Sequence, residues 1–369
     1  MLFKETIAFN NFNLPIVLEQ DCLYYDSLKH TLENYLTEVA FIQNLPLSVV
    51  VNTFKNIKLI LDSVEHYYNA DITAASQKIN TILQRYQNSS FFVSNANSSY
   101  AFKGIIPFNL NPNLYRARKG NLEFQLNDFL HIPLDARGKI ATQRFSIPGV
   151  PCLYLGTTSY VCWLELDKPI DNELNISAFE IPNIKILNLA LTQQLINGHS
   201  NQLETIDPND SEVQKLFHMI ELWPLVCSTS YRIKEDNRVF KSEYIISNLI
   251  MQNLTDFQIE GVAYISKKIK NDSNSFPQAV NLAIPIKSSP SSQSYGDVCR
   301  YISLSNPVNF GEFVKIEHLL TYPFTSLVNR FEGYSSLVEF AGNRINYQKL
   351  PFSKFDDYLL SLNFHTPNF

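Results

Sequence analysis

The first hundred residues alternate apolar and polar positions with the period of amphipathic helices. The apolar positions form three stripes, the first after helix caps available at Asp26 or Ser27: Leu28, Leu32, Tyr35, Leu36 and Val39; Val50, Phe54, Ile57, Leu61 and Val64; and Ile72, Ile79, Ile82, Leu83 and Tyr86. Steps of three and four residues place each set on one face of a helix. We therefore expect a helical N-terminal domain over residues 1–100, with the stripes as its core.

Beyond a polar, turn-rich linker at 88–100, the pattern changes to short strands and helices. The expected strands are 150–156, 261–265, 281–286 and 298–304. Four helices are expected: one that starts near Thr157, Thr158 or Ser159, one that starts at Asp207-Pro208, one at 242–255 and one in the tail at 355–362. A Ser/Pro loop is expected at 288–294. These elements predict an α+β fold. A mixed α/β domain at 101–335 would follow the helical domain, with a C-terminal helical tail at 336–369.

Composition narrows the class of protein. Apolar residues make up 45% of the 369 residues and charged residues 18%, which favours a substantial core over disorder. The net charge of −5 is dispersed without a basic stripe, so we expect no nucleic-acid partner. No apolar run approaches the roughly 18–20 residues that span a bilayer, and no signal-peptide pattern opens the chain. Five scattered cysteines without a C-x-x-C pair favour free thiols, so we expect a cytoplasmic protein without a membrane partner.

Common catalytic motifs are missing from the sequence. It contains neither the glycine-rich phosphate turns of dinucleotide and NTP sites nor a G-x-S-x-G elbow or an H-E-x-x-H pair. The seven histidines are isolated from one another, so we expect no metal site. Hydride transfer, NTP hydrolysis and zinc proteolysis are therefore disfavoured.

Three arginines stand in patterns that suit an anion site. Arg116 and Arg118 lie two apart in a block at 114–118, where a strand would place both on one face. Arg144 precedes the turn at Pro148-Gly149. A guanidinium offers fixed, bidentate donors to a pyrophosphate. A strand-edge salt bridge explains Arg116 equally well, and a structural role for Arg144 is as plausible as a binding one.

Three further side chains complete the candidate pocket. Tyr154 lies in an apolar strand, where its ring either joins the core or stacks on a planar cationic base. Glu165 follows the apolar residues 161–164, where an ionised carboxylate is costly unless it is paired or used. Ser266 ends a strand, and its hydroxyl serves either a cleft or a turn. Together with the arginines, these residues predict a pocket for an anionic, aromatic ligand.

Three blocks, in this order, resemble the motifs of the RES-domain family: Leu-Tyr-Arg-Ala-Arg at 114–118, the segment from Arg144 to Glu165, and Gly-Val-Ala-Tyr-Ile-Ser at 261–266. The middle block is the most specific, because arginine, Pro-Gly turn, Leu-Tyr-Leu strand and helix glutamate occur together. The resemblance covers about half of the chain. It implies a fold akin to the ADP-ribosyltransferase toxins and an activity that splits nicotinamide from NAD. Many family members are toxins neutralised by an antitoxin.

The resemblance also implies roles for single residues. Arg116 and Arg144 would hold the NAD phosphates, Tyr154 would pack on the nicotinamide or its ribose, Glu165 would face the ribose, and Ser266 would hydrogen-bond the ligand. We accordingly expect Glu165, Arg116 and Ser266 to be catalytic and Arg118, Arg144 and Tyr154 to bind substrate, with no metal and no cofactor.

Two features depart from the family pattern. Gln143-Arg144-Phe145-Ser146 stands where family members often have Gly-Arg-Trp-Asn, and the long stretch after Arg116 includes His131. The N-terminal helices are similar to extensions of some family members, including HEPN-like ones. They lack an Arg-x4–6-His motif, so we expect no ribonuclease activity.

One carboxylate suffices for the implied reaction. Glycosidases use two carboxylates because the departing alkoxide must be protonated, whereas nicotinamide in NAD is already a cation and leaves neutral. We therefore expect an NAD glycohydrolase or phosphorylase, with NAD as substrate and phosphate as the co-substrate in the second case. Such an enzyme would act as a toxin or defence effector, with an antitoxin as partner and a homodimer as one available assembly. The alternatives are an ADP-ribosyltransferase acting on a protein and a non-catalytic nucleotide-binding module.

Overall fold

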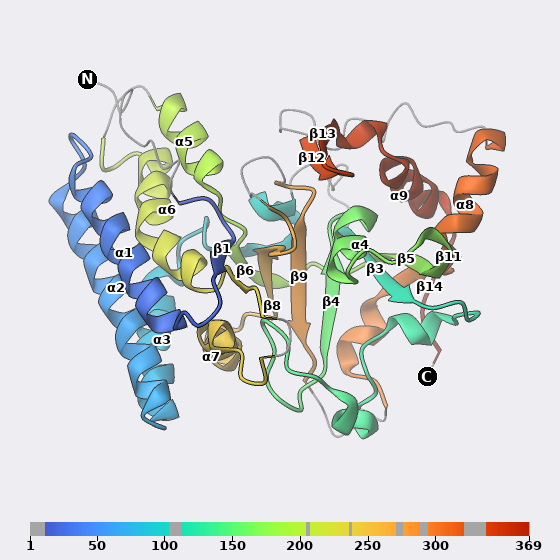
Figure 1. Cartoon of the computed structure of the whole chain (residues 1–369), viewed down its shortest axis with the longest axis horizontal. Coiled ribbons are helices and arrows are strands. Elements are labelled where there is room, and N and C mark those ends of the chain that lie inside the picture. The colour runs from blue at the N-terminus through green and yellow to red at the C-terminus, as the bar shows by residue number, and fades with distance from the viewer. Residues whose placement is uncertain are drawn as a thin grey trace.

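The structure of the chain is a computed structural model that describes residues 12–102, 112–203, 207–235, 238–270, 276–287, 294–320 and 337–368. Apart from residue 294, the loop expected at 288–294 lies outside these ranges. The described chain combines helices with a mixed sheet and is an α+β protein, as the sequence predicts (Figure 1).

Three long helices near the N-terminus lie where the apolar stripes predict them: α1 (Tyr24–Ala40), α2 (Leu47–Tyr68) and α3 (Ile72–Tyr86). Asp71 begins α3, because its carboxylate accepts the N–H of Ala74 at 3.0 Å. Most of the stripe residues are buried, whereas Phe54 and Ile72 remain exposed. The later helices are α4 (Ser159–Glu165), α5 (Gln193–Gln202), α6 (Ser211–Ser228), α7 (Ile245–Asn253), α8 (Phe310–Ile316) and α9 (Pro351–Ser361).

A mixed sheet of ten strands crosses the molecule in the order β14-β10-β5-β3-β4-β9-β8-β6-β2, with β11 paired to β5. Its strands are β2 (Val93–Asn95), β3 (Asn113–Lys119), β4 (Cys152–Gly156), β5 (Leu174–Glu180), β6 (Lys185–Leu189), β8 (Gly261–Ile265), β9 (Val280–Pro285), β10 (Ser303–Ser305), β11 (Val308–Asn309) and β14 (Phe364–His365). β6 and β8 run parallel, and β4, β9 and β8 are antiparallel neighbours at the centre. β1 (Ile16–Leu18) pairs separately with β7 (Tyr231–Ile233), and β12 (Leu337–Phe340) with β13 (Asn343–Asn346).

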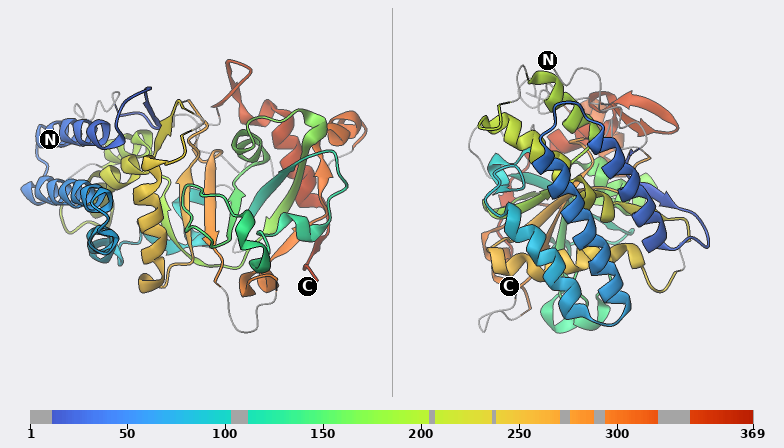
Figure 2. Two further views of the ribbon diagram at one scale, coloured as in Figure 1. Left: turned by 60° about the horizontal axis from the view of Figure 1, so that its bottom comes forward. Right: turned by 90° about the vertical axis from the view of Figure 1, so that its left-hand side faces the viewer.

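The two faces of this sheet carry two hydrophobic cores. Successive residues of a strand point to opposite faces, so Leu187 and Val262 join one core while Ile186 and Ala263 join the other. Helices α1–α3, α6 and α7 cover the first core, and α4, α8 and α9 cover the second. These two groups of helices lie on opposite sides of the molecule (Figures 1 and 2). The first three helices thus share a core with helices from beyond residue 210; the domain boundary expected near residue 100 stays a prediction.

A proline inside α6 fixes this helix to α1 and α2. Because Pro224 has no N–H, the carbonyl of Ile220 loses its usual helix donor. The hydroxyl of Tyr35 donates to that carbonyl at 2.8 Å, and the Asn56 side chain donates to the next one, that of Glu221, at 2.8 Å. The Tyr35 side chain therefore replaces the backbone hydrogen bond that α6 cannot make at Ile220, and Asn56 adds a second contact at the next carbonyl.

Removing one of these donors tests the attachment. Tyr35→Phe deletes only the buried hydroxyl and is expected to lower the free energy of unfolding by about 1–3 kcal/mol, measured by urea denaturation. The matched control is Tyr25→Phe, because the Tyr25 hydroxyl donates to Glu65 at the exposed surface of the same helices. Equal stability of the two variants would contradict the role of Tyr35.

Two element predictions are wrong. The helix expected to start at Asp207-Pro208 begins instead at Ser211, because Asp210 is the N-cap and its carboxylate accepts the N–H of Glu212 at 2.7 Å. The strand expected at 298–304 is mostly a 3₁₀ turn at Asp297–Tyr301, and only the short β10 follows it.

The C-terminal part contains more than the helix expected there. Besides α9, which packs in the second core, it contains the β12–β13 hairpin and β14, an edge strand of the large sheet. Among the described helices, none combines the length and hydropathy needed to cross a bilayer.

Candidate functional site

Arg144 occupies the centre of the region where the three sequence blocks meet. It precedes β4 and is almost completely buried, with 6% of its surface exposed. Its guanidinium donates to the carbonyl of Thr229 at 3.0 Å and to that of Ile265, at the end of β8, at 2.6 Å. It also lies 4.4 Å from the ring centre of Tyr264, a cation–π distance. Arg144 thus joins the end of α6 to the end of β8.

Tyr154 and Arg116 extend this cluster across β4 and β3. The Tyr154 hydroxyl donates to the carbonyl of Phe145 at 3.0 Å, and burial raises its pKa. Arg116 donates to the backbone carbonyl of Tyr154 at 3.1 Å. Burial, with a smaller contribution from Arg118, lowers the pKa of Arg116. The Nε atom of Arg116 is buried without a hydrogen-bond partner among the described residues.

Glu165 lies at the C-terminal end of α4, and its side chain is exposed rather than buried. The expectation of a carboxylate enclosed by apolar neighbours is therefore wrong: α4 buries Val161, Cys162 and Leu164 but ends at Glu165. Its Oε1 accepts from the Nδ2 of Asn281 at 2.6 Å. Asn281 lies on β9 directly opposite Tyr264 on β8, so Glu165 is held beside the ring that faces Arg144.

Ser266 and Arg118 are engaged in local structure. The Ser266 hydroxyl, 1% exposed, accepts the N–H of Lys268 at 3.1 Å, which is the turn role weighed from the sequence. Arg118 donates to the carbonyls of Asp128 and Leu130 at 2.7 and 2.9 Å and so braces the segment after β3. The structure thus brings Arg116, Tyr154 and Arg144 into one chain of contacts. Glu165 and Ser266 lie beside these three linked residues, and the Arg118 guanidinium points to the carbonyls of Asp128 and Leu130 instead.

His131 is also structural. Its Nε2 accepts the N–H of Gly296 at 3.0 Å, which leaves Nδ1 to donate to the carbonyl of Ile132 at 2.7 Å. Burial lowers the pKa of His131, in keeping with a neutral ring that uses both nitrogens in the fold. A proton-transfer role for His131 therefore has no support from its contacts.

Lys267 and its partner Glu243 are functional candidates that the sequence does not predict. Lys267 Nζ lies 3.5 Å from Glu243 Oε1 and donates to the Tyr244 hydroxyl at 3.0 Å. Burial, and then the charge of Arg144, lower the pKa of Lys267 to about 7, although Glu243 and Glu165 act in the opposite direction. An amine with this pKa can hold or release a proton at neutral pH. In the sequence, only its position directly after Ser266 marks Lys267 as a candidate. The pairing with Glu243 depends on the fold, because the two residues are distant in the sequence.

The lowered pKa predicts a pH-dependent contribution of Lys267 to stability. Between about pH 7 and the ordinary lysine value of 10.5, the unfolded chain binds more protons than the folded one. The free energy of unfolding therefore rises with pH in this window. Below the window Lys267 is charged in both states, and the folded chain bears the full cost of burying that charge. The unfolding free energy of the wild type minus that of Lys267→Met should rise by about 1.4 kcal/mol per pH unit between pH 7.5 and 9.5, measured by urea denaturation. Lys58→Met, at an exposed position of α2, should show no such slope; a flat difference for Lys267 would refute the shift.

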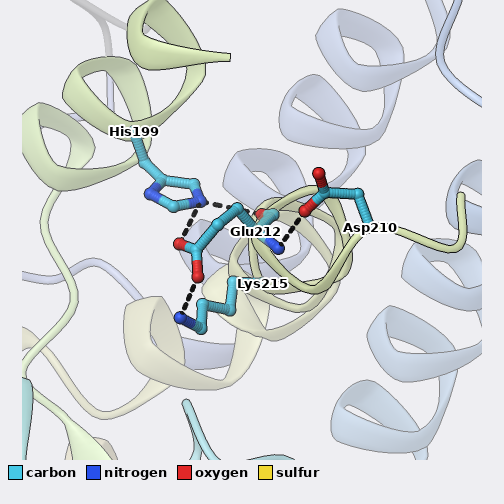
Figure 3. Close-up of polar contacts among 4 residues, drawn as sticks. All are labelled: His199, Asp210, Glu212 and Lys215. Atoms are coloured by element: carbon cyan, nitrogen blue, oxygen red, sulfur yellow. Dashed lines mark hydrogen bonds and ion pairs between the residues drawn. The ribbon is translucent and has the colours of Figure 1, made fainter. Parts of the chain in front are cut away.

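A cavity of about 1030 Å³ lies where α5 and α6 face the segment around β2. Three of its charged or titratable groups contact one another: the Glu212 carboxylate lies between Lys215 and the Nε2 of His199, which is 3.7 Å away (Figure 3). A further lining residue, Lys185, donates to the carbonyl of Phe257 at 3.1 Å. His199 also lies 2.8 Å from the Glu212 carbonyl, and Asp210 caps the same helix. These contacts fasten α5 to α6. None of the six expected site residues lines this cavity, whereas Arg116, Tyr154 and Arg144 are linked by contacts; we therefore place the candidate site at these three residues, the Arg144 cluster.

Comparison with known proteins finds similarity over part of the chain. No protein-family model matches the chain, and no solved structure matches it. The chain is similar to a protein of Bacillus subtilis (strain 168) named "Putative toxin YopC", with 32% identity over 206 residues. The match covers 54% of this chain and 46% of that protein, so the chain spans about half the length of this relative.

Proposed function

We propose that this chain cleaves the bond between nicotinamide and ribose in NAD and acts as a toxin. Three observations support the proposal. Three sequence blocks resemble the RES-domain motifs, Arg116, Tyr154 and Arg144 from two of them are linked by contacts, and a relative with 32% identity bears the name of a toxin. A toxin of this kind requires a protein that restrains it in its own cell, so the proposal includes an antitoxin partner.

The observation that carries the proposal is the position of Glu165 beside the arginine cluster. Asn281 holds one carboxylate oxygen at 2.6 Å, and the side chain is open to solvent at the end of α4. A fixed carboxylate stabilises positive charge that develops on a ribose as its bond to nicotinamide breaks. Because nicotinamide departs as a neutral molecule, this chemistry needs no second carboxylate as general acid.

The buried arginines Arg144 and Arg116 would hold the strands around the site in fixed positions. Arg144 fixes the end of β8 through the carbonyl of Ile265, and Arg116 fixes β4 through that of Tyr154. Holding reacting groups in one geometry contributes strongly to catalysis.

One experiment tests the proposal directly. Purified full-length chain is incubated with NAD, with and without phosphate, and the products are identified by mass spectrometry. Nicotinamide with ADP-ribose would indicate water as acceptor, and nicotinamide with phosphorylated ADP-ribose would indicate phosphate. An ADP-ribose adduct on a protein would favour the transferase, and intact NAD in both mixtures would reduce the site to a nucleotide-binding module.

A further inference from the structure

A cavity of about 420 Å³ lies beside the Arg144 cluster and is unusually basic. It is formed by the segment after α4, the end of β7, the turn before α7 and the residues after β8. Of its thirteen described lining residues, seven are lysine or arginine and three are acidic, in a chain whose net charge is −5. We call it the basic pocket; Lys168, Arg232, Lys241, Glu243, Lys267 and Lys268 are among its lining residues.

Three of these cations have no carboxylate partner within the described ranges. Lys268 pairs with Asp167, and Lys267 with Glu243. Arg232, Lys168 and Lys241, by contrast, make no ion pair with any described residue. Unpaired cations that converge on one cavity raise the local concentration of anions and favour phosphate groups in particular. The pocket therefore has the charge of a phosphate site.

The same pocket contains a buried acceptor without a donor. Glu243 is 2% exposed, and its Oε2 has no hydrogen-bond partner among the described residues, while Oε1 faces Lys267. A buried polar atom left unpaired is costly, and a ligand hydroxyl would satisfy it. A ligand that carries both phosphates and hydroxyl donors, such as a sugar phosphate, fits this combination.

The basic pocket adjoins the proposed catalytic carboxylate. Leu164 and Asp167, which lie on either side of Glu165 in the sequence, line it, as does Lys267. Lys267 follows Ser266 directly, at the end of the strand that Arg144 holds. A nucleotide with its sugar at Glu165 would thus have its phosphates within reach of the pocket.

We propose that the basic pocket binds the diphosphate and an adjoining ribose of the nucleotide on which Glu165 acts. Arg232 and Lys241 face the phosphates, and Glu243 accepts a hydrogen bond from the sugar. This assignment rests on the proposed function and moves the phosphate contacts away from Arg144 and Arg118, whose guanidinium groups each donate to two backbone carbonyls. Those two arginines then hold the framework of the site.

The charge part of the proposal is tested by binding of ADP-ribose to the full chain, measured by calorimetry at low and high salt. Arg232→Ala combined with Lys241→Ala should raise the Kd by about tenfold or more, since two charge-assisted contacts are lost. Inorganic pyrophosphate should compete with ADP-ribose in the wild type, and added salt should weaken binding. The matched control is Lys55→Ala combined with Lys58→Ala on the exposed face of α2, which should bind as the wild type does. An unchanged Kd in the pocket variant would overturn the proposal.

The role of Glu243 is tested by comparing ADP-ribose with ADP, because both carry the diphosphate and only ADP-ribose carries the second ribose. The wild type should prefer ADP-ribose, and Glu243→Ala should lose most of that preference. A preference that is absent in the wild type, or unchanged in the variant, would remove Glu243 from the assignment.

These outcomes separate this inference from the proposed function. If NAD stays intact but ADP-ribose binding depends on Arg232 and Lys241, the pocket assignment stands and the cleavage proposal falls. If NAD is cleaved but ADP-ribose binding is insensitive to the double substitution, the cleavage proposal stands and the pocket assignment falls.

Discussion

Glu165→Gln is expected to reduce the rate of NAD cleavage by about a hundredfold to a thousandfold while leaving nucleotide binding nearly unchanged. Glutamine retains an oxygen that can accept from Asn281, the residue that holds Glu165 at 2.6 Å, so the local geometry should survive. What is lost is the negative charge that would stabilise the positive ribose in the transition state. The measurement is kcat and KM for NAD, with the effect expected in kcat.

The control for this substitution is Glu33→Gln, which makes the same chemical change at an exposed position of α1. It should leave kcat and KM at their wild-type values. Wild-type turnover in Glu165→Gln would exclude Glu165 from the reaction, and a large rise in KM alone would make it a binding residue.

Arg144→Met is expected to lower the free energy of unfolding by about 2–5 kcal/mol, because two main-chain carbonyls lose a charged donor in a buried setting. Those carbonyls belong to Thr229 and Ile265, and the ring of Tyr264 loses its cation as well. Methionine roughly keeps the length of the side chain, so the loss reports mainly on the hydrogen bonds and charge. Urea denaturation at pH 7 measures the change.

Arg137→Met provides the matched control, since Arg137 also donates to a backbone carbonyl, that of Gly149, but from an exposed position. It should change stability by no more than about 0.5 kcal/mol. If Arg144→Met proved as stable as this control, Arg144 would be a ligand-binding residue rather than a structural one.

Much of the fold follows from local patterns in the sequence. Helix α3 and strand β8 occur at the expected residues, because an apolar stripe or a compact apolar run defines each of them. The sequence does not fix the start of α6, because Asp207 and Asp210 are both suitable N-caps, and the structure uses the second. The 3₁₀ turn at Asp297–Tyr301 contains Val298 and Tyr301, residue types that are common in strands, so residue preference alone predicts the wrong conformation there.

The candidate site was less predictable, because its contacts join distant parts of the chain. Residue types identified Arg144 and Glu165, but the partners Thr229 and Asn281 are 85 and 116 residues away from them. The burial of a side chain at the end of a helix also depends on neighbours that the local sequence does not reveal. Lys267 became a candidate only once the fold placed it against Glu243 and near Arg144.

Helix α6 has a consequence for how this protein can evolve. Near its middle, Tyr35 and Asn56 from the N-terminal helices hold its carbonyls, and just beyond its end the carbonyl of Thr229 anchors Arg144. A gene fusion that exchanged the first three helices for unrelated ones would strip α6 of those donors and disturb the anchor. The helices and the arginine cluster should therefore be inherited together, as a single recombination unit.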